Sequence, residues 1–205
     1  MTTKEAAVTA IPTLTTKRLV LRPLDNADIP GFVEIWSDPE FTRYIGGRSD
    51  PDSVWPAMAG NIGCWALTGV GPWAAVERST GSLVGRAGLL WTEAGRPGVE
   101  ASRPGVEAGW FIRRDRWDRG YAREAASAAI GWAFAQRPDL DEVVAVILSD
   151  NTASVRVAER LGMTPKRLEF IHGEDHAVHT ISQADWTAAL RGLPAVPAQG
   201  RQNAR

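Results

Sequence analysis

The sequence predicts a single domain of the mixed α/β class. Residues 106 to 162 contain, in order, a strand, a turn with a glycine, a helix, a continuous apolar strand and a second helix. Two hairpin patterns flank this unit, because short apolar runs meet at Ser79-Thr80-Gly81 and again at Gly173-Glu174-Asp175. A parallel unit joined to antiparallel hairpins is typical of a mixed sheet with helices packed on it.

The length and composition fit such a domain and exclude other classes of protein. The chain has 205 residues, of which 44% are hydrophobic, enough for a substantial core. Its formal net charge of −1 gives no basic field for nucleic acid or an anionic membrane. No stretch reaches the roughly 18 apolar residues of a membrane span. Cys64 is the single cysteine, so a disulfide within the chain is excluded and a cytoplasmic location is expected.

The first half of the chain predicts strands mixed with two helices. From the N-terminus, we expect a strand, two helices, the two strands of a hairpin and a further strand, at 17–23, 25–38, 50–69, 72–78, 82–91 and 106–112. The domain should cover 15–191, between a flexible N-terminus (1–14) and a disordered tail (192–205). Cys64 lies in the second helix beside Trp65, where a packing role is favoured over a nucleophilic one.

The second half continues the alternation. We expect a helix, a strand, a helix, a hairpin of two strands and a last helix, at 120–136, 141–149, 151–162, 166–172, 176–182 and 182–192. The helix at 120–136 has one apolar face made mostly of alanine, so it can lie close to a sheet. The run at 141–149 is apolar almost throughout, which predicts a strand covered on both faces. Ser182 and Asp185 have capping-box spacing.

The turn before the alanine-faced helix predicts an anion site. Free N–H groups and the positive end of the helix dipole meet at this helix start. Gly120 permits close approach of a ligand to the backbone, and Ala122 lacks bulk. Five arginines face three acids over residues 112–125, a local positive surplus that favours a phosphate or pyrophosphate. The turn is not a P-loop, because no Gly-Lys-Ser/Thr follows it.

Several stretches here resemble the GNAT superfamily of acyl-CoA-dependent N-acetyltransferases. "WDRGYAREA" is similar to the "W-G-x-G-Y-A-T-E-A" pattern of the ribosomal-protein-alanine N-acetyltransferase-like branch, and "NTASVRVAERLGM" to its Asn-x-x-Ser helix. "TTKRLVLRPL", "VEAGWFI" and "HTISQADW" resemble three other segments of that branch in the same order. The resemblance implies a mostly antiparallel central sheet flanked by helices, with two splayed parallel strands forming a wedge for the acyl-CoA.

The resemblance also implies a binding mode for acetyl-CoA as co-substrate, without a metal. Backbone N–H groups of the loop would hold its pyrophosphate, and the backbone of the preceding strand would pair with its pantetheine arm. Asn151 would bond the arm from the far side, and a bulge at Gly109 would begin the splay. The implied contact residues are Trp110, Phe111, Ile112, Trp117, Asp118, Arg119, Gly120, Tyr121, Ala122, Arg123, Asn151 and Ser154. Asp118 stands where the family has glycine.

Two glutamates compete for the role of general base. "RPGVEA" occurs at 96–101 and again at 103–108, so Glu100 and Glu107 share one local sequence. The second copy leads directly into the predicted cofactor strand, and Glu107 is therefore the candidate proton acceptor for the attacking amine. Glu107 could alternatively only order its neighbours. Ser154 could protonate the leaving thiolate, as the resemblance implies, or bond the backbone at its helix start.

The acceptor and several side chains are left open by the sequence. The acceptor is expected to be a small amine or a protein N-terminus, with Trp36, Phe41 and Tyr44 either lining its site or packing in the core. A non-catalytic acyl-CoA-binding or sensing module is the alternative function. The chain is expected to be a monomer or a homodimer. His172, His176 and His179 flank the second hairpin, but no set of cysteines or carboxylates completes a metal site.

Overall fold

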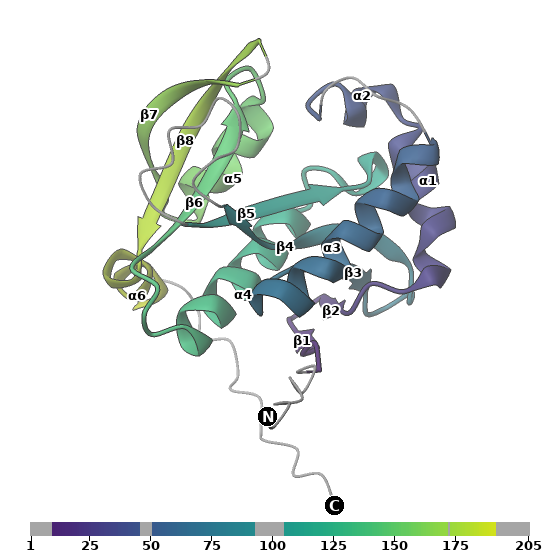
Figure 1. The fold of residues 1–205 in the computed structure, drawn as a ribbon, viewed down its shortest axis with the longest axis horizontal. Helices are drawn as coiled ribbons and strands as arrows, with labels where there is room; N and C mark the ends of the chain where they lie inside the picture. The colour runs from purple at the N-terminus through teal and green to yellow at the C-terminus, as the bar shows by residue number, and fades with distance from the viewer. Residues whose placement is uncertain (1–9, 46–50, 93–104, 172, 192–205) are drawn as a thin grey trace, which may run out of the picture.

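A computed structural model of the protein describes residues 10–45, 51–92, 105–171 and 173–191. Within these residues, eight strands form one sheet in the order β1-β2-β3-β4-β5-β6-β8-β7. β5 and β6 pair in parallel, whereas the other neighbouring strands of this sheet are antiparallel. Helices pack against the sheet (Figure 1). The predicted fold class, a mostly antiparallel sheet flanked by helices, is confirmed.

The elements follow the predicted order. The strands are β1 Leu14–Thr15, β2 Leu19–Arg22, β3 Pro72–Glu77, β4 Leu83–Thr92, β5 Gly105–Ile112, β6 Glu142–Leu148, β7 Thr164–Ile171 and β8 Glu174–Ser182. The α-helices are α1 Ile29–Trp36, α2 Pro39–Thr42, α3 Val54–Thr68, α4 Tyr121–Gln136, α5 Thr152–Arg160 and α6 Gln183–Arg191. Short 3-10 helices are η1 Asn26–Asp28, η2 Pro51–Ser53 and η3 Arg114–Arg116. No described helix is both long enough and apolar enough to span a bilayer.

Helix α4 covers one face of the sheet through its alanine side. Ala125, Ala126, Ala129 and Ala133 are at most 1% exposed, and the helix packs against β2, β4 and β5. Side chains this small let the helix axis come close to the strands, and burial of apolar surface stabilises the contact. The predicted packing face of this helix is therefore confirmed.

The other face is covered by α1, α2 and the first turns of α3. Phe32 and Ile35 of α1, Phe41 of α2 and Met58 of α3 are buried together against the sheet. Phe111 of β5 packs against this group of buried side chains. The sheet thus separates the face on which α4 packs from a face on which aromatic side chains gather.

Strand β6 differs from the prediction that it is covered on both faces. Its burial alternates, with Val143, Ala145 and Ile147 buried and Val144 and Val146 only partly so. The buried positions belong to the same core as α4. The helices of the opposite face pack on β3 and β4 instead, which leaves that side of β6 more accessible.

The parallel pair β5–β6 opens into a wedge. The two strands pair at Val106–Val143 and Glu107–Val144 and at no later position, although β5 continues to Ile112 and β6 to Leu148. β5 keeps one register with β4 throughout, and β6 does the same with β8. Each strand therefore follows its own neighbour, and β6, β8 and β7 turn away from β5 (Figure 1).

The predicted bulge at Gly109 is wrong. The β4–β5 ladder runs without a shift from Gly85–Ile112 to Thr92–Gly105, so Gly109 occupies a regular strand position. A side chain at Gly109 would meet no atom within 4 Å. The splay comes from the different courses of the two neighbouring ladders, and Gly109 leaves open space beside it.

Candidate active site

The CoA loop, Trp117–Arg123, follows β5 and η3 and ends in the first turn of α4. Two of its residues have left-handed backbone, Gly120 with φ 75° and Asp118 with φ 57°. Glycine adopts this conformation without steric cost, and aspartate is one of the few other residues that tolerates it. The replacement of the family's glycine by Asp118 therefore keeps the shape of the loop. The Trp117 indole N–H donates to the carbonyl of Ile112 at 2.6 Å and closes the loop onto β5.

The start of α4 has open hydrogen-bond donors. Gly120 is the N-cap residue, and no described side chain caps this helix. The N–H groups of Tyr121, Ala122 and Arg123 have no partner within the helix, because the first such bond joins Glu124 N–H to the carbonyl of Gly120. These N–H groups are the donors that the predicted anion site would use.

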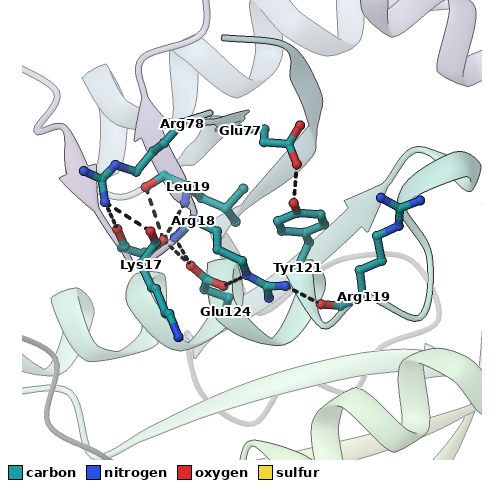
Figure 2. A network of polar contacts seen from close by, with 9 residues as sticks. Lys17, Arg18, Leu19, Glu77, Arg78, Arg119, Tyr121 and Glu124 are labelled. Atoms are coloured by element: carbon teal, nitrogen blue, oxygen red, sulfur yellow. Dashed lines mark hydrogen bonds and ion pairs between the residues drawn. The ribbon is translucent and has the colours of Figure 1, made fainter. Parts of the chain in front are cut away.

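Arg18 of the N-terminal segment fixes the loop from the side of β2. Its guanidinium donates to the carbonyl of Arg119 at 2.6 Å and to the Glu124 carboxylate at 2.7 Å. It also lies 4.4 Å from the centre of the Tyr121 ring. Figure 2 shows these contacts of Arg18, and in it the side chain of Arg119 points away from Arg18. Sequence reasoning missed Arg18, since its partners lie about a hundred residues away.

The Arg18 contact orients the peptide that enters the helix. In a planar trans peptide the C=O and the following N–H point in opposite directions. Because the carbonyl of Arg119 is held by Arg18, the N–H of Gly120 points away from Arg18. It therefore adds to the donors at the start of α4.

The local arginine surplus is smaller than the sequence count. Arg113 and Arg116 both bind Asp115, at 2.6 and 2.7 Å. Arg119 and Arg123 form no ion pair with any residue that the structure describes. These two side chains, together with the helix start, supply the positive charge of the loop.

Tyr121 contributes its backbone to the loop and its side chain to the core. Its hydroxyl donates to the Glu77 carboxylate, which also accepts from Thr80 at 2.8 Å. The hydrogen bond from Tyr121, with that from Thr80, lowers the pKa of Glu77. The same bond raises the pKa of Tyr121. The hydroxyl is thus engaged beneath the loop, and Tyr121 supplies no acid to the wedge.

The wedge edge of β5 presents alternate peptide groups. Arg113 N–H bonds to the carbonyl of Val84, and hydrogen-bonded pairs alternate along an antiparallel ladder. It follows that Phe111 directs its peptide groups to β4, whereas Trp110 and Ile112 direct theirs toward the gap with β6. The sequence grouped all three as backbone contacts, and this alternation removes Phe111 from that group.

Across the wedge, the N-terminus of α5 holds the second predicted cluster. The Asn151 side chain accepts a hydrogen bond from the N–H of Ser154 at 3.0 Å and caps the helix. The Ser154 hydroxyl makes no hydrogen bond with a residue in the described ranges. The alternative in which this hydroxyl bonds the helix backbone is therefore not observed. Both residues follow β6, at the end where it has separated from β5.

Glu107 lies where the parallel strands separate. It forms the last β5–β6 pair, with Val144, and faces Leu90 of β4. Its side chain is partly buried. It lies on the same face of β5 as the side chain of Phe111, which is four residues further along the strand. Glu100 lies outside the described residues, so the structure does not compare the two copies.

An aromatic group covers the face of the sheet that carries Glu107. The ring of Phe111 lies 5.0 Å from that of Trp36 and 5.1 Å from that of Phe41. Both residues were candidates for the acceptor side, whereas Tyr44 contacts Arg43 and not this group. A hollow of about 560 Å³ lies next to Phe41, between α1 and the segment after β5. Its charges are paired, including Arg113 with Glu34 at 3.0 Å.

The remaining candidates form no metal site in the described ranges, where no three His, Cys, Asp or Glu side chains gather suitably. His176 faces Glu169 across the β7–β8 ladder, and His179 is buried on β8. His172 lies outside the described residues. Cys64 is partly buried on α3.

A splayed parallel strand pair therefore adjoins an uncapped helix start in this fold. Residues 18–164 match the family described as an acetyltransferase (GNAT) domain, so the chain belongs to the GNAT family of acetyltransferases. The resemblance inferred from the sequence is thereby confirmed. The uncharacterized protein YkkB of Bacillus subtilis (strain 168) is 30% identical over 151 residues, which cover 73% of this chain and 84% of that protein.

Solved structures of other acetyltransferases have a similar fold. The acetyltransferase from Agrobacterium tumefaciens str. C58 is 32% identical with a TM-score of 0.71, over 85% of this chain and 96% of that one. The aminoglycoside acetyltransferase AAC(6')-Ib, in complex with coenzyme A, has the same TM-score over 83% of this chain and 98% of that one. Its identity is 13%, so this second likeness concerns the fold alone.

The Arg18–Glu124 contact predicts a pH-dependent stability. Burial acts to raise the pKa of Glu124, but hydrogen bonds from Thr16 and Arg18 outweigh it and lower the pKa below the ordinary 4.5. A lowered carboxyl pKa stabilises the fold above the ordinary value, and this stabilisation is lost as the pH falls through the folded-state value. Glu124→Gln should lower the free energy of unfolding by about 1 kcal/mol at pH 7 and by less near about pH 3, below the ordinary carboxyl pKa of 4.5. Urea unfolding at both pH values measures this, and an equal loss at both would contradict it.

Asp118 predicts a second measurable effect. Its carboxylate is exposed in the CoA loop, where it should repel bound phosphates. Asp118→Asn removes the charge and still tolerates the left-handed backbone. We expect both Asp118→Asn and Asp118→Gly to tighten CoA binding by about 2- to 5-fold, more at low salt, because salt screens exposed charges. Calorimetric titration measures this, and weaker binding by Asp118→Asn would mean that the carboxylate makes a needed contact.

Proposed function

We propose that the protein transfers an acetyl group from acetyl-CoA to a primary amine, by direct attack while both substrates are bound. The single observation that carries the proposal is the wedge: β5 and β6 part after Glu107–Val144, and β5 then leads into the uncapped start of α4. A phosphate binder and an open strand edge therefore adjoin one another. Acetyl-CoA offers a diphosphate and an amide-containing arm, which these two features suit.

The residues of the chain have separate tasks in this proposal. N–H groups from Gly120 to Arg123 hold the diphosphate, and the peptide groups of Trp110 and the N–H of Ile112 pair with the arm. Asn151 fixes the start of α5, because its side chain already binds the N–H of Ser154. Acetyl-CoA, when bound, supplies an activated thioester carbonyl at the inner end of the wedge.

Glu107 and Ser154 would manage the protons. The amine reaches its nucleophilic form by losing a proton to Glu107, directly or through water. Its nitrogen then forms the new C–N bond as the C–S bond breaks. The Ser154 hydroxyl donates a proton to the departing thiolate and regains one through water, because the acylated nitrogen gives up its remaining extra proton as the amide forms. Support for these roles comes from position: Glu107 lies at the point of splay, and the Ser154 hydroxyl is not used as a helix cap.

Release of free thiol from acetyl-CoA, measured against a panel of primary amines, tests the proposal. We expect thiol release that requires both acetyl-CoA and an amine, with an acetylated amine as the second product. An acyl-CoA-binding or sensing module would bind acetyl-CoA and release no thiol with any amine. Two features favour this alternative. Asp118 places a carboxylate in the CoA loop, and the Tyr121 hydroxyl binds Glu77 and supplies no acid to the wedge.

A further inference from the structure

Arg86 is a partly buried cation on the face of the sheet that carries Glu107. It lies in β4, directly opposite Phe111 of β5, and its side chain is partly buried. Its guanidinium carbon lies 4.7 Å from the centre of the Phe111 ring. That ring also contacts Trp36 and Phe41. Arg86 is therefore held over the aromatic group by a cation–π contact with one of its rings.

No carboxylate of the described residues forms an ion pair with Arg86, and no hydrogen bond joins it to them. Most other partly buried arginines of the described residues have carboxylate partners, and Arg123 is an exception. The paired arginines include Arg18, Arg22, Arg113, Arg116 and Arg137. Burial lowers the pKa of Arg86 to about 10, which still leaves it charged at neutral pH. A charged fork of five N–H donors is expensive to bury unless something accepts its hydrogen bonds.

The candidate base lies within electrostatic reach of Arg86. Among the described residues, Cys64 of α3 and Glu107 of β5 interact electrostatically with Arg86, whereas Glu34 and Asp115 act on Arg113 at the opposite end of β5. Between Arg86 and Glu107 lies Gly109, beside which a side chain would meet only open space. Arg86, the open space beside Gly109 and Glu107 therefore lie in this order along one face of the β4–β5 ladder.

We propose that Arg86 binds a carboxylate of the acceptor, so that the acceptor is a small molecule carrying both a primary amine and a carboxylate, such as an amino acid or a short peptide. This inference rests on the proposed function and names its substrate class. The planar fork of arginine matches a carboxylate through two parallel hydrogen bonds. The amine would then lie at Glu107, beyond Gly109, and the carboxylate at Arg86.

The register sets the spacing of the two groups. Arg86 faces Phe111, four residues along β5 from Glu107, and a strand rises about 3.4 Å per residue. An acceptor with several atoms between its amine and its carboxylate should fit better than one with adjacent groups.

The test uses matched acceptors. A series of ω-amino acids from glycine to aminohexanoate, and short peptides with a free C-terminus, is compared with the corresponding C-terminal amides, while spermidine provides a polycation. In the parent protein, we expect kcat/KM for a carboxylate acceptor to exceed that for its amide by roughly 10- to 100-fold, because loss of the matching group leaves a buried polar group unpaired. Equal rates for acids and amides, or preference for spermidine, would overturn the inference.

Arg86 variants assign this preference to one side chain. Arg86→Gln should remove the preference by lowering kcat/KM for the acids to that for the amides, and Arg86→Lys should restore part of it, because lysine keeps the charge but not the fork. Arg167→Gln is the control, since Arg167 binds Glu169 on the edge strand β7. A variant that lowers rates equally for acids and amides would show that Arg86 only supports Phe111 or Glu107.

The failures of the two proposals can be told apart. If no amine in either set releases thiol while acetyl-CoA binds, the proposed function fails. If amines are acetylated without regard to their carboxylate, the proposed function stands and the assignment of Arg86 is wrong.

Discussion

Replacing Glu107 with glutamine is expected to lower kcat by roughly 10²- to 10⁴-fold, the usual range for losing a general base. Glutamine preserves the shape and hydrogen-bonding reach of glutamate but accepts no proton at neutral pH. Since Glu107 lies at the point where β5 and β6 separate and not in the CoA loop, the affinity for CoA should be nearly unchanged. Steady-state kinetics combined with a CoA titration separates the two effects.

The chain supplies the control for this substitution. Glu100 has the same six-residue context as Glu107, so Glu100→Gln tests whether local sequence alone matters, and we expect it to be close to silent. The pH–rate profile of the parent should contain a limb that Glu107→Gln removes. Equal and small effects of both substitutions would show that another group, such as a water held by backbone carbonyls, takes the proton.

Gly120→Val is expected to weaken CoA binding by roughly 10- to 100-fold. Gly120 has φ 75° at the N-cap of α4, a conformation that costs a β-branched residue of order 1–3 kcal/mol. The loop would relieve this strain by rotating its peptides, which moves the N–H groups that bind phosphate. Each 1.4 kcal/mol corresponds to a tenfold change in affinity. Calorimetric titration with CoA measures the loss.

Two further variants test the explanation. Gly60 of α3 has ordinary helical geometry and open space beside it, so Gly60→Val should leave CoA binding unchanged. Arg119→Ala removes an exposed charge and should weaken binding only modestly, and more at low salt. If Arg119→Ala weakened binding as much as Gly120→Val, side-chain charge rather than backbone N–H groups would hold the phosphates.

Features with a local cause were predictable from the sequence. The alanine spacing of α4 predicted its buried face, because one residue in every three or four returns to the same side of a helix. The same holds for the Ser182–Asp185 cap, in which Asp185 N–H donates to Ser182 at 3.1 Å. Gly120 predicted a close backbone turn, and it has left-handed backbone.

Features that depend on distant segments were not predictable. Arg18 contacts the CoA loop only because β2 and α4 pack together in the fold, and nothing near Arg18 in the sequence indicates this. The Tyr121–Glu77 pair is hidden for the same reason. The continuous apolar run of β6 suggested cover on both faces, but the position of α1 and α3 over β4 is a property of the whole fold. The direction of the Phe111 peptide groups, toward β4 and away from the wedge, follows only from the hydrogen-bond alternation of the β4–β5 ladder.

Residue-resolved amide hydrogen exchange by NMR, with and without saturating CoA, tests the central claim most directly. The account predicts slower exchange at Gly120 and Tyr121–Arg123, where N–H groups would bind phosphate, and at Trp110 and Ile112, whose N–H groups face the wedge. Amides of the β7–β8 hairpin should be unaffected. Saturated binding that leaves both segments unprotected, or that protects a different part of the chain, would contradict the claim that the wedge and the start of α4 form the acyl-CoA site.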